Sequence, residues 1–167
     1  WRTVAANIGL ALEAAKVPAD QRPARIAKVL QTVGLNHHAD KYPWQLSGGM
    51  QQRVQIARCL AQEPAVMLMD EPFGALDAMT REGLQDELAR LVREQGLTVV
   101  FVTHDLEEAI YLGDRVIALR ANPTADKPSL AAEVPVTLAH PRKQLETKEH
   151  PEFLRLRRDL YQYLGHH

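Results

Sequence analysis

This sequence has one cysteine, no excess of either charge and no long apolar run. Cys59, the single cysteine among 167 residues, cannot form an internal disulfide, which suits a reducing cytosol. The 20 lysines and arginines nearly balance the 21 aspartates and glutamates, so the composition gives no electrostatic case for nucleic acid or an anionic membrane surface as a partner. No apolar run approaches the roughly 20 residues that a membrane span needs, and no signal peptide is visible. We therefore expect a soluble chain that reaches a membrane only through a partner.

Two features that could indicate reactive sites have simpler explanations. Cys59 falls near the apolar face of an expected helix with no histidine nearby, so it is interpreted as a small buried hydrophobe rather than a nucleophile. His37 and His38 are neighbours on an expected loop and have no carboxylate or thiol partner at ligand spacing. This pair therefore indicates a solvated loop rather than a metal site.

The stretch LSGGMQQRVQIARCLA, residues 46–61, predicts a helix with an anion-binding start. Its apolar residues recur at helical spacing, at Met50, Val54, Ala57, Leu60 and Ala61. Ser47 is a good N-cap, and Gly48 and Gly49 let another group approach the backbone closely. A helix that opens in this way points free N–H groups and the positive end of its dipole outward. We therefore expect a phosphate group to bind there.

A buried strand followed by two carboxylates comes next. The run 66–69 is apolar without alternation and is bounded by Pro64 and Pro72, which predicts a parallel-sheet strand buried on both faces. Asp70 and Glu71 follow at its carboxyl end, where open α/β sheets bind ligands. Since adjacent strand residues point to opposite sides, the two carboxylates can have different tasks. One suits Mg²⁺, and the other suits an attacking water.

The rest of the chain predicts further helices and strands. Helices are expected over residues 1–17, 20–34, 79–95, 106–112 and 150–164, and strands over 98–102, 114–119 and 131–138. On the helix 79–95, Asp86 and Arg90 are expected to form a solvated ion pair. The strand 98–102 also delivers polar residues at its carboxyl end: Thr103, His104 and Asp105.

Four of these segments together resemble the ATP-binding cassette (ABC) ATPase family. LSGGM matches the family's signature motif, with Met50 in place of the usual glutamine, and VMLMDE matches its Walker B motif. GALD, residues 74–77, resembles the D-loop, and THD, residues 103–105, resembles the switch-histidine segment. Motifs in the family's order at plausible spacing are far more specific than any one alone. The resemblance implies an α/β fold, the parallel sheet of an incomplete P-loop NTPase (ABC ATPase) with a helical subdomain.

The resemblance also divides the chain and marks what is missing. Residues 1–62 would form the helical subdomain with the signature helix, 63–120 the C-terminal part of the nucleotide-binding α/β core, and 121–167 a C-terminal strand and helix extension. No GxxxxGK[ST] P-loop occurs, so the resemblance covers about the C-terminal two-thirds of a family member. The family's P-loop strand lies between the strands ending at Thr103 and spanning 115–119. We therefore expect a second chain or a rearranged segment against those edges.

The signature residues acquire a nucleotide-binding role from the resemblance. In the family's head-to-tail dimer, Ser47 and the amides of Gly48 and Gly49 would stabilise the γ-phosphate of a nucleotide held by the partner subunit. Met50 departs from the family's glutamine, which puts one side-chain contact in doubt. Asp77 has two interpretations, a cap on the helix that begins near Ala78 or the family's intersubunit contact.

Catalytic roles follow from the same resemblance. Asp70 would hold Mg²⁺, Glu71 would polarise the attacking water, and His104 would contact the γ-phosphate from its own subunit. Asp105, with Glu108 three residues later, is interpreted as a helix cap. Because the P-loop is missing, we expect the chain by itself to bind ATP poorly and to hydrolyse none.

The tail of the chain, AAEVPVTL followed by HPEFLRLRRDLY, resembles more loosely the importers for nitrate, sulfonates and taurine. The resemblance implies an ATPase subunit that is cytoplasmic and peripheral on the inner face of the cell membrane, where it drives the import of such small anions. Its partners would be a transmembrane permease subunit, a second ATPase subunit in a homodimer and, indirectly, a solute-binding protein, but no nucleic acid. Trp1 and Trp44 are candidates for the permease contact, and ordinary packing explains either residue equally well.

Two other functions compete with import. The first is a non-transport ABC ATPase that acts on DNA or ribosomes. DNA-repair members carry long coiled-coil insertions before the signature, and no heptads precede it here. The second is a non-catalytic regulatory fragment, which only the absent P-loop supports. The transported solute cannot be derived from the chain, because specificity lies in partner proteins.

Overall fold

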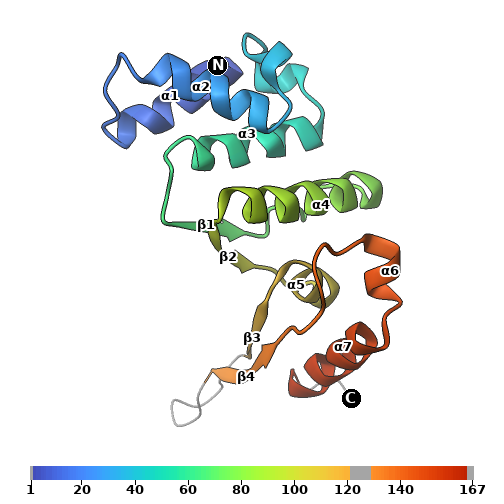
Figure 1. Cartoon of the computed structure of the whole chain (residues 1–167). Helices are drawn as coiled ribbons and strands as arrows, with labels where there is room; N and C mark the ends of the chain where they lie inside the picture. The colour runs from blue at the N-terminus through green and yellow to red at the C-terminus, as the bar shows by residue number, and fades with distance from the viewer. Residues whose placement is uncertain (1, 121–128, 165–167) are drawn as a thin grey trace. The chain divides into compact units, whose positions relative to one another are not determined.

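Figure 1 shows the computed structural model, which describes residues 2–120 and 129–164. Trp1 lies outside these residues. The chain forms two compact units. The first contains Met67 and the described residues before it, together with Pro72–Leu84 and Leu97–Val99. The second contains Leu68–Glu71, Gln85–Gly96 and the described residues from Val100 onward.

The first unit is built on the helices α1 (Val4–Ala14), α2 (Arg22–Thr32) and α3 (Gly48–Leu60). Helix α1 packs against both α2 and α3. The segment expected as a loop forms two short 3-10 turns, η1 (Asn36–His38) and η2 (Pro43–Gln45). Most apolar residues on the inner faces of these helices are buried, among them Val4, Ile8, Leu12, Val29, Leu30 and Val54, whereas Met50 and Leu60 are partly exposed. The predicted helices of this region are confirmed, because their apolar stripes meet each other.

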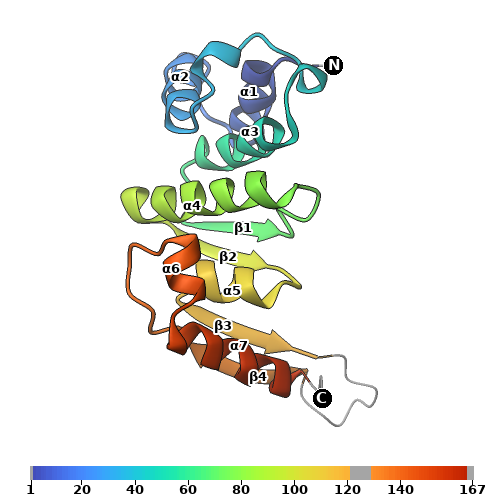
Figure 2. The same cartoon turned by 90° about the vertical axis from the view of Figure 1, so that its right-hand side faces the viewer.

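Strands β1 (Val66–Asp70) and β2 (Thr98–Val102) form a two-stranded sheet, and α4 (Ala78–Gln95) connects them. Both strands run in the same direction in Figure 2. A helix between two parallel strands is the repeating element of α/β proteins. The predicted α/β class is therefore confirmed.

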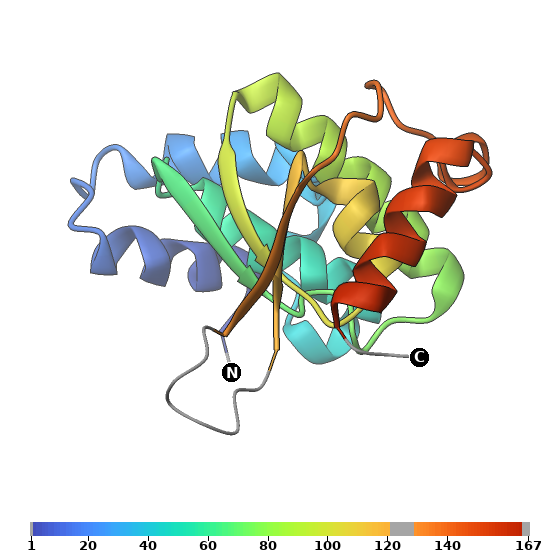
Figure 3. The same cartoon turned by 90° about the horizontal axis from the view of Figure 1, so that it is seen from below.

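The second unit continues with α5 (Leu106–Leu112), β3 (Arg115–Leu119), β4 (Leu130–Pro135), α6 (Gln144–Lys148) and α7 (Pro151–Tyr163). Strand β4 pairs antiparallel with β3, from Arg115 opposite Pro135 to Leu119 opposite Leu130. Helix α7 packs against α5 and β4 (Figure 3). The core of this unit is one cluster of buried side chains: Ile110, Tyr111, Val116, Ala118, Val136, Leu138, Phe153, Leu156 and Leu160. The short helix α6 was not predicted from the sequence.

The expected burial of β1 on both faces is wrong for this chain. Met67 and Met69 are buried, whereas Leu68 is 73% exposed. Strands β2 and β3 lie in different two-stranded sheets, and no strand within residues 2–120 and 129–164 occupies the free edges of β2 and β3. The expected rearranged segment is therefore not found there, and the expected second chain stays a prediction. One face of β1 is exposed because no layer of the described chain covers it.

The expected ion pair between Asp86 and Arg90 on α4 is also wrong. Arg90 pairs with Glu94 instead. One oxygen of Asp86 accepts hydrogen bonds from the Tyr111 hydroxyl at 2.6 Å and from the Gln144 amide at 3.1 Å. These tertiary partners replace the pair because a hydrogen bond in a half-buried site is worth more than an exposed ion pair.

Candidate functional site

Helix α3 begins where the sequence predicts, and Ser47 is its N-cap. The Ser47 backbone is extended, and its hydroxyl oxygen accepts a hydrogen bond from the Met50 amide at 3.3 Å. Ser47 and Gly48 are exposed, whereas Gly49 is buried. The first amides of a helix have no partner within the helix, so an exposed start such as this one can bind an anion.

The two glycines of the signature have a packing reason that sequence reasoning missed. A Cβ atom on Gly49 would lie 2.7 Å from the Thr80 methyl group, and one on Gly48 would lie 3.3 Å from the Leu76 side chain. The start of α3 therefore runs against residues 76–80 closely enough to exclude a side chain at Gly49. No local pattern in the sequence indicates this contact, because the partner residues lie some thirty positions downstream.

Asp77 caps the start of α4. Its carboxylate accepts a hydrogen bond from the Thr80 amide at 3.0 Å. Hydrogen bonds from Thr80 lower the pKa of Asp77, so its carboxylate is ionised at neutral pH. The capping interpretation of Asp77 is confirmed. Its side chain is also exposed, and the intersubunit contact stays a prediction.

Asp70 and Glu71 lie at the carboxyl end of β1, but only Asp70 belongs to the strand. Glu71 has a φ of 43°, in the left-handed region that residues with a side chain rarely adopt. Its amide donates a hydrogen bond to the Val102 carbonyl at 2.8 Å, which holds this turn against the end of β2. The sequence argument assumed that strand alternation sets the direction of the Glu71 side chain. This assumption fails, because Glu71 lies beyond the end of β1 in a left-handed turn. Backbone strain of this kind is concentrated at functional sites.

Glu71 and His104, the two predicted catalytic residues, lie in contact. Nδ1 of His104 is 2.8 Å from Oε1 of Glu71, and both side chains are exposed. Because a carboxylate only accepts, Nδ1 must carry the hydrogen and Nε2 points to other partners. The hydrogen bond and the negative charge of Glu71 raise the pKa of His104 above its usual value. The charged imidazolium is therefore favoured beside the end of β1.

The segment after His104 is held by local hydrogen bonds. The Asp105 amide donates to the Thr103 hydroxyl at 3.0 Å. The Asp105 carboxylate accepts from the amides of Glu107 and Glu108, so Asp105 is the N-cap of α5, as predicted. Glu108 does not complete a capping box, because its buried carboxylate accepts a hydrogen bond from Gln85 at 2.9 Å.

The donors available for a metal are few. In the part of the chain that the structure describes, no group of three or more histidine, cysteine, aspartate or glutamate side chains could hold a metal ion. Asp70 offers one exposed carboxylate. Mg²⁺ bound together with a nucleotide uses one or two carboxylates, phosphate oxygens and waters, so Asp70 fits that kind of site and not a self-contained metal centre.

Relatives among known proteins match nearly the whole chain. The family model for ABC transporters matches residues 2–74. The bicarbonate transport ATP-binding protein CmpC of Synechococcus elongatus is 43% identical over 167 residues, which cover 99% of this chain and 25% of CmpC. The nitrate import ATP-binding protein NrtC of the same organism is 45% identical over 166 residues, with 98% and 25% covered. The chain belongs to the ABC transporter family.

Two further comparisons extend the match of this ABC chain. The aliphatic sulfonates import ATP-binding protein SsuB of Delftia acidovorans is 44% identical over 165 residues, which cover 99% of the chain and 62% of SsuB. The solved structure of cbiO1 from Clostridium perfringens, part of the ABC transporter complex cbiONQ, has a TM-score of 0.62 and 31% identity over 69% of the chain and 46% of cbiO1. The chain spans a quarter of the length of CmpC and NrtC, at 25% each.

Proposed function

We propose that this ABC chain is part of the ATP-hydrolysing subunit of an importer for small anions. The contact between Glu71 and His104 at the end of β1 carries the proposal. ATP hydrolysis needs a group that orients the attacking water and a group that binds the γ-phosphate, and a carboxylate beside an imidazole can supply both. Three relatives that match nearly the whole chain are named for the transport of bicarbonate, nitrate and aliphatic sulfonates, all of them anions. Their names favour import over action on DNA or ribosomes. Taurine carries a sulfonate group and stays within the proposed class.

The catalytic roles are divided between neighbouring side chains. Glu71 would accept a hydrogen bond from the attacking water and orient it, and its strained turn would hold the carboxylate in place. His104, with Nδ1 donating to Glu71, keeps Nε2 for an oxygen of the γ-phosphate. Asp70 would hold Mg²⁺, which neutralises phosphate charge when bound.

The signature residues would act on a different nucleotide. In the proposed homodimer, Ser47 and the amides of Gly48 and Gly49 stabilise the terminal phosphate of ATP bound by the second subunit. Met50 contributes its amide to the Ser47 cap, so the missing glutamine side chain leaves the start of α3 intact. Asp77, exposed beside the same region of the first unit, would contact the second subunit. Without a P-loop lysine, the chain by itself would bind ATP weakly and hydrolyse none.

Trp44 is the proposed contact with a membrane permease. It is 67% exposed and stacks on Tyr42, with ring centroids 4.5 Å apart. An exposed pair of stacked rings offers a rigid apolar surface to a partner. A permease would place the subunit on the inner face of the membrane, with a solute-binding protein as an indirect partner. Among the described helices, none is long and apolar enough to cross a bilayer.

The decisive experiment removes the Glu71 charge in the complete protein, expressed with its permease. Glu71→Gln keeps the size of the side chain and is expected to lower ATP turnover by at least about 100-fold while ATP binding persists. Glu94→Gln on α4 is the matched control, because that glutamate is exposed and pairs with Arg90 on its own helix. Cells that lack the protein should regain anion import with wild type and not with Glu71→Gln. Unchanged turnover in Glu71→Gln, or import of none of nitrate, bicarbonate and sulfonates, would contradict the proposal.

A further inference from the structure

Helix α5 joins the predicted switch residue His104 to the C-terminal part of the chain. It has 7 residues, and its N-cap Asp105 directly follows His104. The cap bonds from Asp105 to Glu107 and Glu108 tie the backbone beside His104 to the first turn of the helix. A helix this short does not hold itself together in water, so its placement depends on what packs around it.

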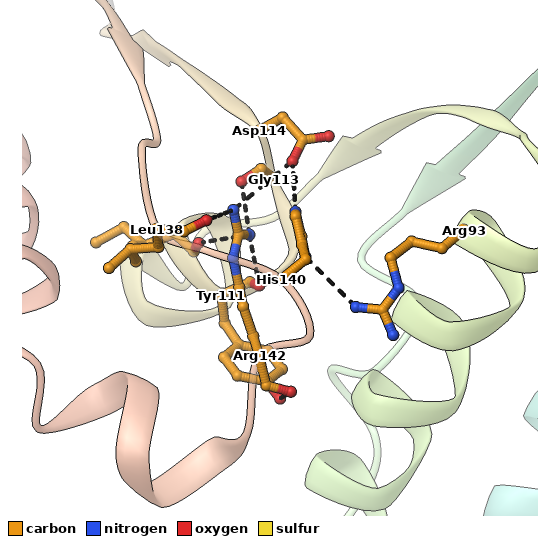
Figure 4. Close-up of polar contacts among 8 residues, drawn as sticks. Arg93, Tyr111, Gly113, Asp114, Leu138, His140 and Arg142 are labelled. Atoms are coloured by element: carbon orange, nitrogen blue, oxygen red, sulfur yellow. Dashed lines mark hydrogen bonds and ion pairs between the residues drawn. The ribbon is translucent and has the colours of Figure 1, made fainter.

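The C-terminal end of α5 is held by Arg142, which lies between β4 and α6 (Figure 4). The Arg142 side chain is 1% exposed. Its guanidinium donates hydrogen bonds to carbonyl oxygens at the end of α5 and just after it: Ile110 at 3.3 Å, Tyr111 at 2.9 Å and Gly113 at 2.8 Å. A fourth bond goes to the Leu138 carbonyl at 3.3 Å. The carbonyls of Ile110, Tyr111 and Gly113 lie at the negative end of the α5 dipole, which favours a cation.

The ion pair that Arg142 forms within the described residues is long and partly open to solvent. The carboxylate of Asp114 lies 3.6 Å from the guanidinium and is largely exposed. His140 Nε2 lies 2.9 Å from the same Asp114 carboxylate, so that carboxylate is shared. Burial lowers the pKa of Arg142, although an arginine stays charged at neutral pH. A buried charge that is stabilised mainly by carbonyl oxygens is costly, so its place at the end of α5 indicates a specific task.

The middle of α5 is held by a chain of side-chain hydrogen bonds. The Gln144 amide donates to Gln85 at 3.0 Å, and the Gln85 amide donates to Glu108 at 2.9 Å. Gln85 and Glu108 are both buried. The Tyr111 hydroxyl lies 2.6 Å from Asp86 and 3.1 Å from the Arg142 carbonyl. Helix α5 is thereby linked both to α4 and to the segment that contains Arg142.

The first turn of α5 is held by α7. Arg157 donates a hydrogen bond to Glu107 at 2.6 Å. Phe153, Leu156 and Leu160 of α7 belong to the same buried cluster as Ile110 and Tyr111. The C-terminal segment therefore contacts α5 at its start, its middle and its end.

We propose that residues 140–164 are a positioning element for His104, with Arg142 as its central residue, acting through α5. This inference rests on the proposed ATPase function, because His104 must act on a phosphate for its position to matter. Arg142 and Arg157 touch no reacting atom and are positioning residues. Loss of either lets α5 shift and carries His104 away from Glu71, and a misplacement of about 1 Å at a reacting group costs up to about 100-fold in rate.

The test compares two arginines of the same helix in the complete protein. Arg157→Met removes the contact to α5, whereas Arg155→Met removes only bonds to Glu152 and Asp159 within α7. Arg157→Met is expected to lower kcat for ATP hydrolysis with the KM for ATP changed less than twofold, and Arg155→Met is expected to match wild type. Arg142→Met is expected to lower kcat further, by about tenfold or more. In the 167-residue chain, the His104 imidazole signals in NMR spectra should shift in Arg142→Met and Arg157→Met only.

Each outcome decides the question. If Arg142→Met does not fold, Arg157→Met with its Arg155→Met control carries the test alone. Wild-type kcat and unshifted His104 signals in a folded Arg157→Met protein overturn the inference, as does an equal loss in Arg155→Met. Glu71→Gln separates this failure from that of the proposed function. If Glu71→Gln abolishes ATP turnover while Arg157→Met keeps the turnover of wild type, the proposed ATPase function stands and only the positioning role of residues 140–164 is contradicted.

Discussion

At the level of single residues, the hydrogen bond between His104 and Glu71 determines how the imidazole titrates. The folded protein holds the pKa of His104 above its usual value because Glu71 accepts the Nδ1 hydrogen and carries a negative charge. A raised folded pKa means that this pair stabilises the fold fully below the unfolded pKa of about 6.5 and that the contribution is lost as pH rises through the folded pKa.

We therefore predict that Glu71→Gln lowers the pKa of His104 toward its ordinary value. The amide keeps a hydrogen-bond acceptor but loses the charge that favours the imidazolium. NMR titration of the His104 ring measures the pKa directly. Glu94→Gln, which changes an exposed carboxylate on α4, should leave the His104 titration unchanged. An identical His104 pKa in wild type and Glu71→Gln would contradict the contact.

At the level of elements, the two glycines at the start of α3 serve different purposes. Gly49 lies against Thr80 so closely that a side chain has no room, while Gly48 faces solvent. The signature motif therefore includes a packing requirement within the first unit. Gly48 carries the exposed backbone that the proposed phosphate contact needs.

Gly49→Ala is predicted to destabilise the chain by about 1–3 kcal/mol, because Thr80 is β-branched and cannot move its methyl group easily. Gly48→Ala is the matched control. Its Cβ would meet Leu76 at 3.3 Å, and the gain of about 0.5–1 kcal/mol from replacing a helical glycine offsets the contact. Urea denaturation followed by circular dichroism measures both. Equal stability of the two variants would remove the packing explanation.

At the level of the whole molecule, the strands expose apolar side chains that an isolated chain does not cover. On β3, Ile117 is 53% exposed and Leu119 is 64% exposed. The free edge of β3 among the described strands adds unpaired backbone groups. Such surfaces bind other strands, whether from the rest of the protein or from a second copy.

The isolated chain is therefore predicted to self-associate as its concentration rises. Leu119→Lys should shift the equilibrium toward monomer, because a charge on an exposed strand opposes edge pairing. Leu145→Lys is the control, since Leu145 is similarly exposed at 71% but lies on the short helix α6. Sedimentation at several concentrations measures the association. A chain that stays monomeric throughout would show that the exposed strands do not associate.

Much of the fold could be predicted from the sequence, and the candidate site only in part. The helical stripes of α1, α2 and α3 and the strands before Asp70 and Thr103 follow from local periodicity, which a linear pattern contains. Both residues were assigned to catalysis from the sequence, Glu71 and His104, but their contact was not predicted, because it depends on how the turns after β1 and β2 fold. Cys59 is half buried, and burial raises the pKa of its thiol, in agreement with an unreactive residue.

The sequence by itself determined where most helices and strands form, where α3 and α5 are capped, and which family's motifs the chain carries, because each of these depends on neighbours within a few residues. Only the tertiary structure decided that Gly49 faces Thr80, that Glu71 adopts a left-handed turn, and that Arg142 is buried at the end of α5. These features depend on groups brought together from distant parts of the chain. Arg142 lies in a stretch with no periodic pattern, so its neighbours in the sequence do not predict the carbonyl oxygens that it binds.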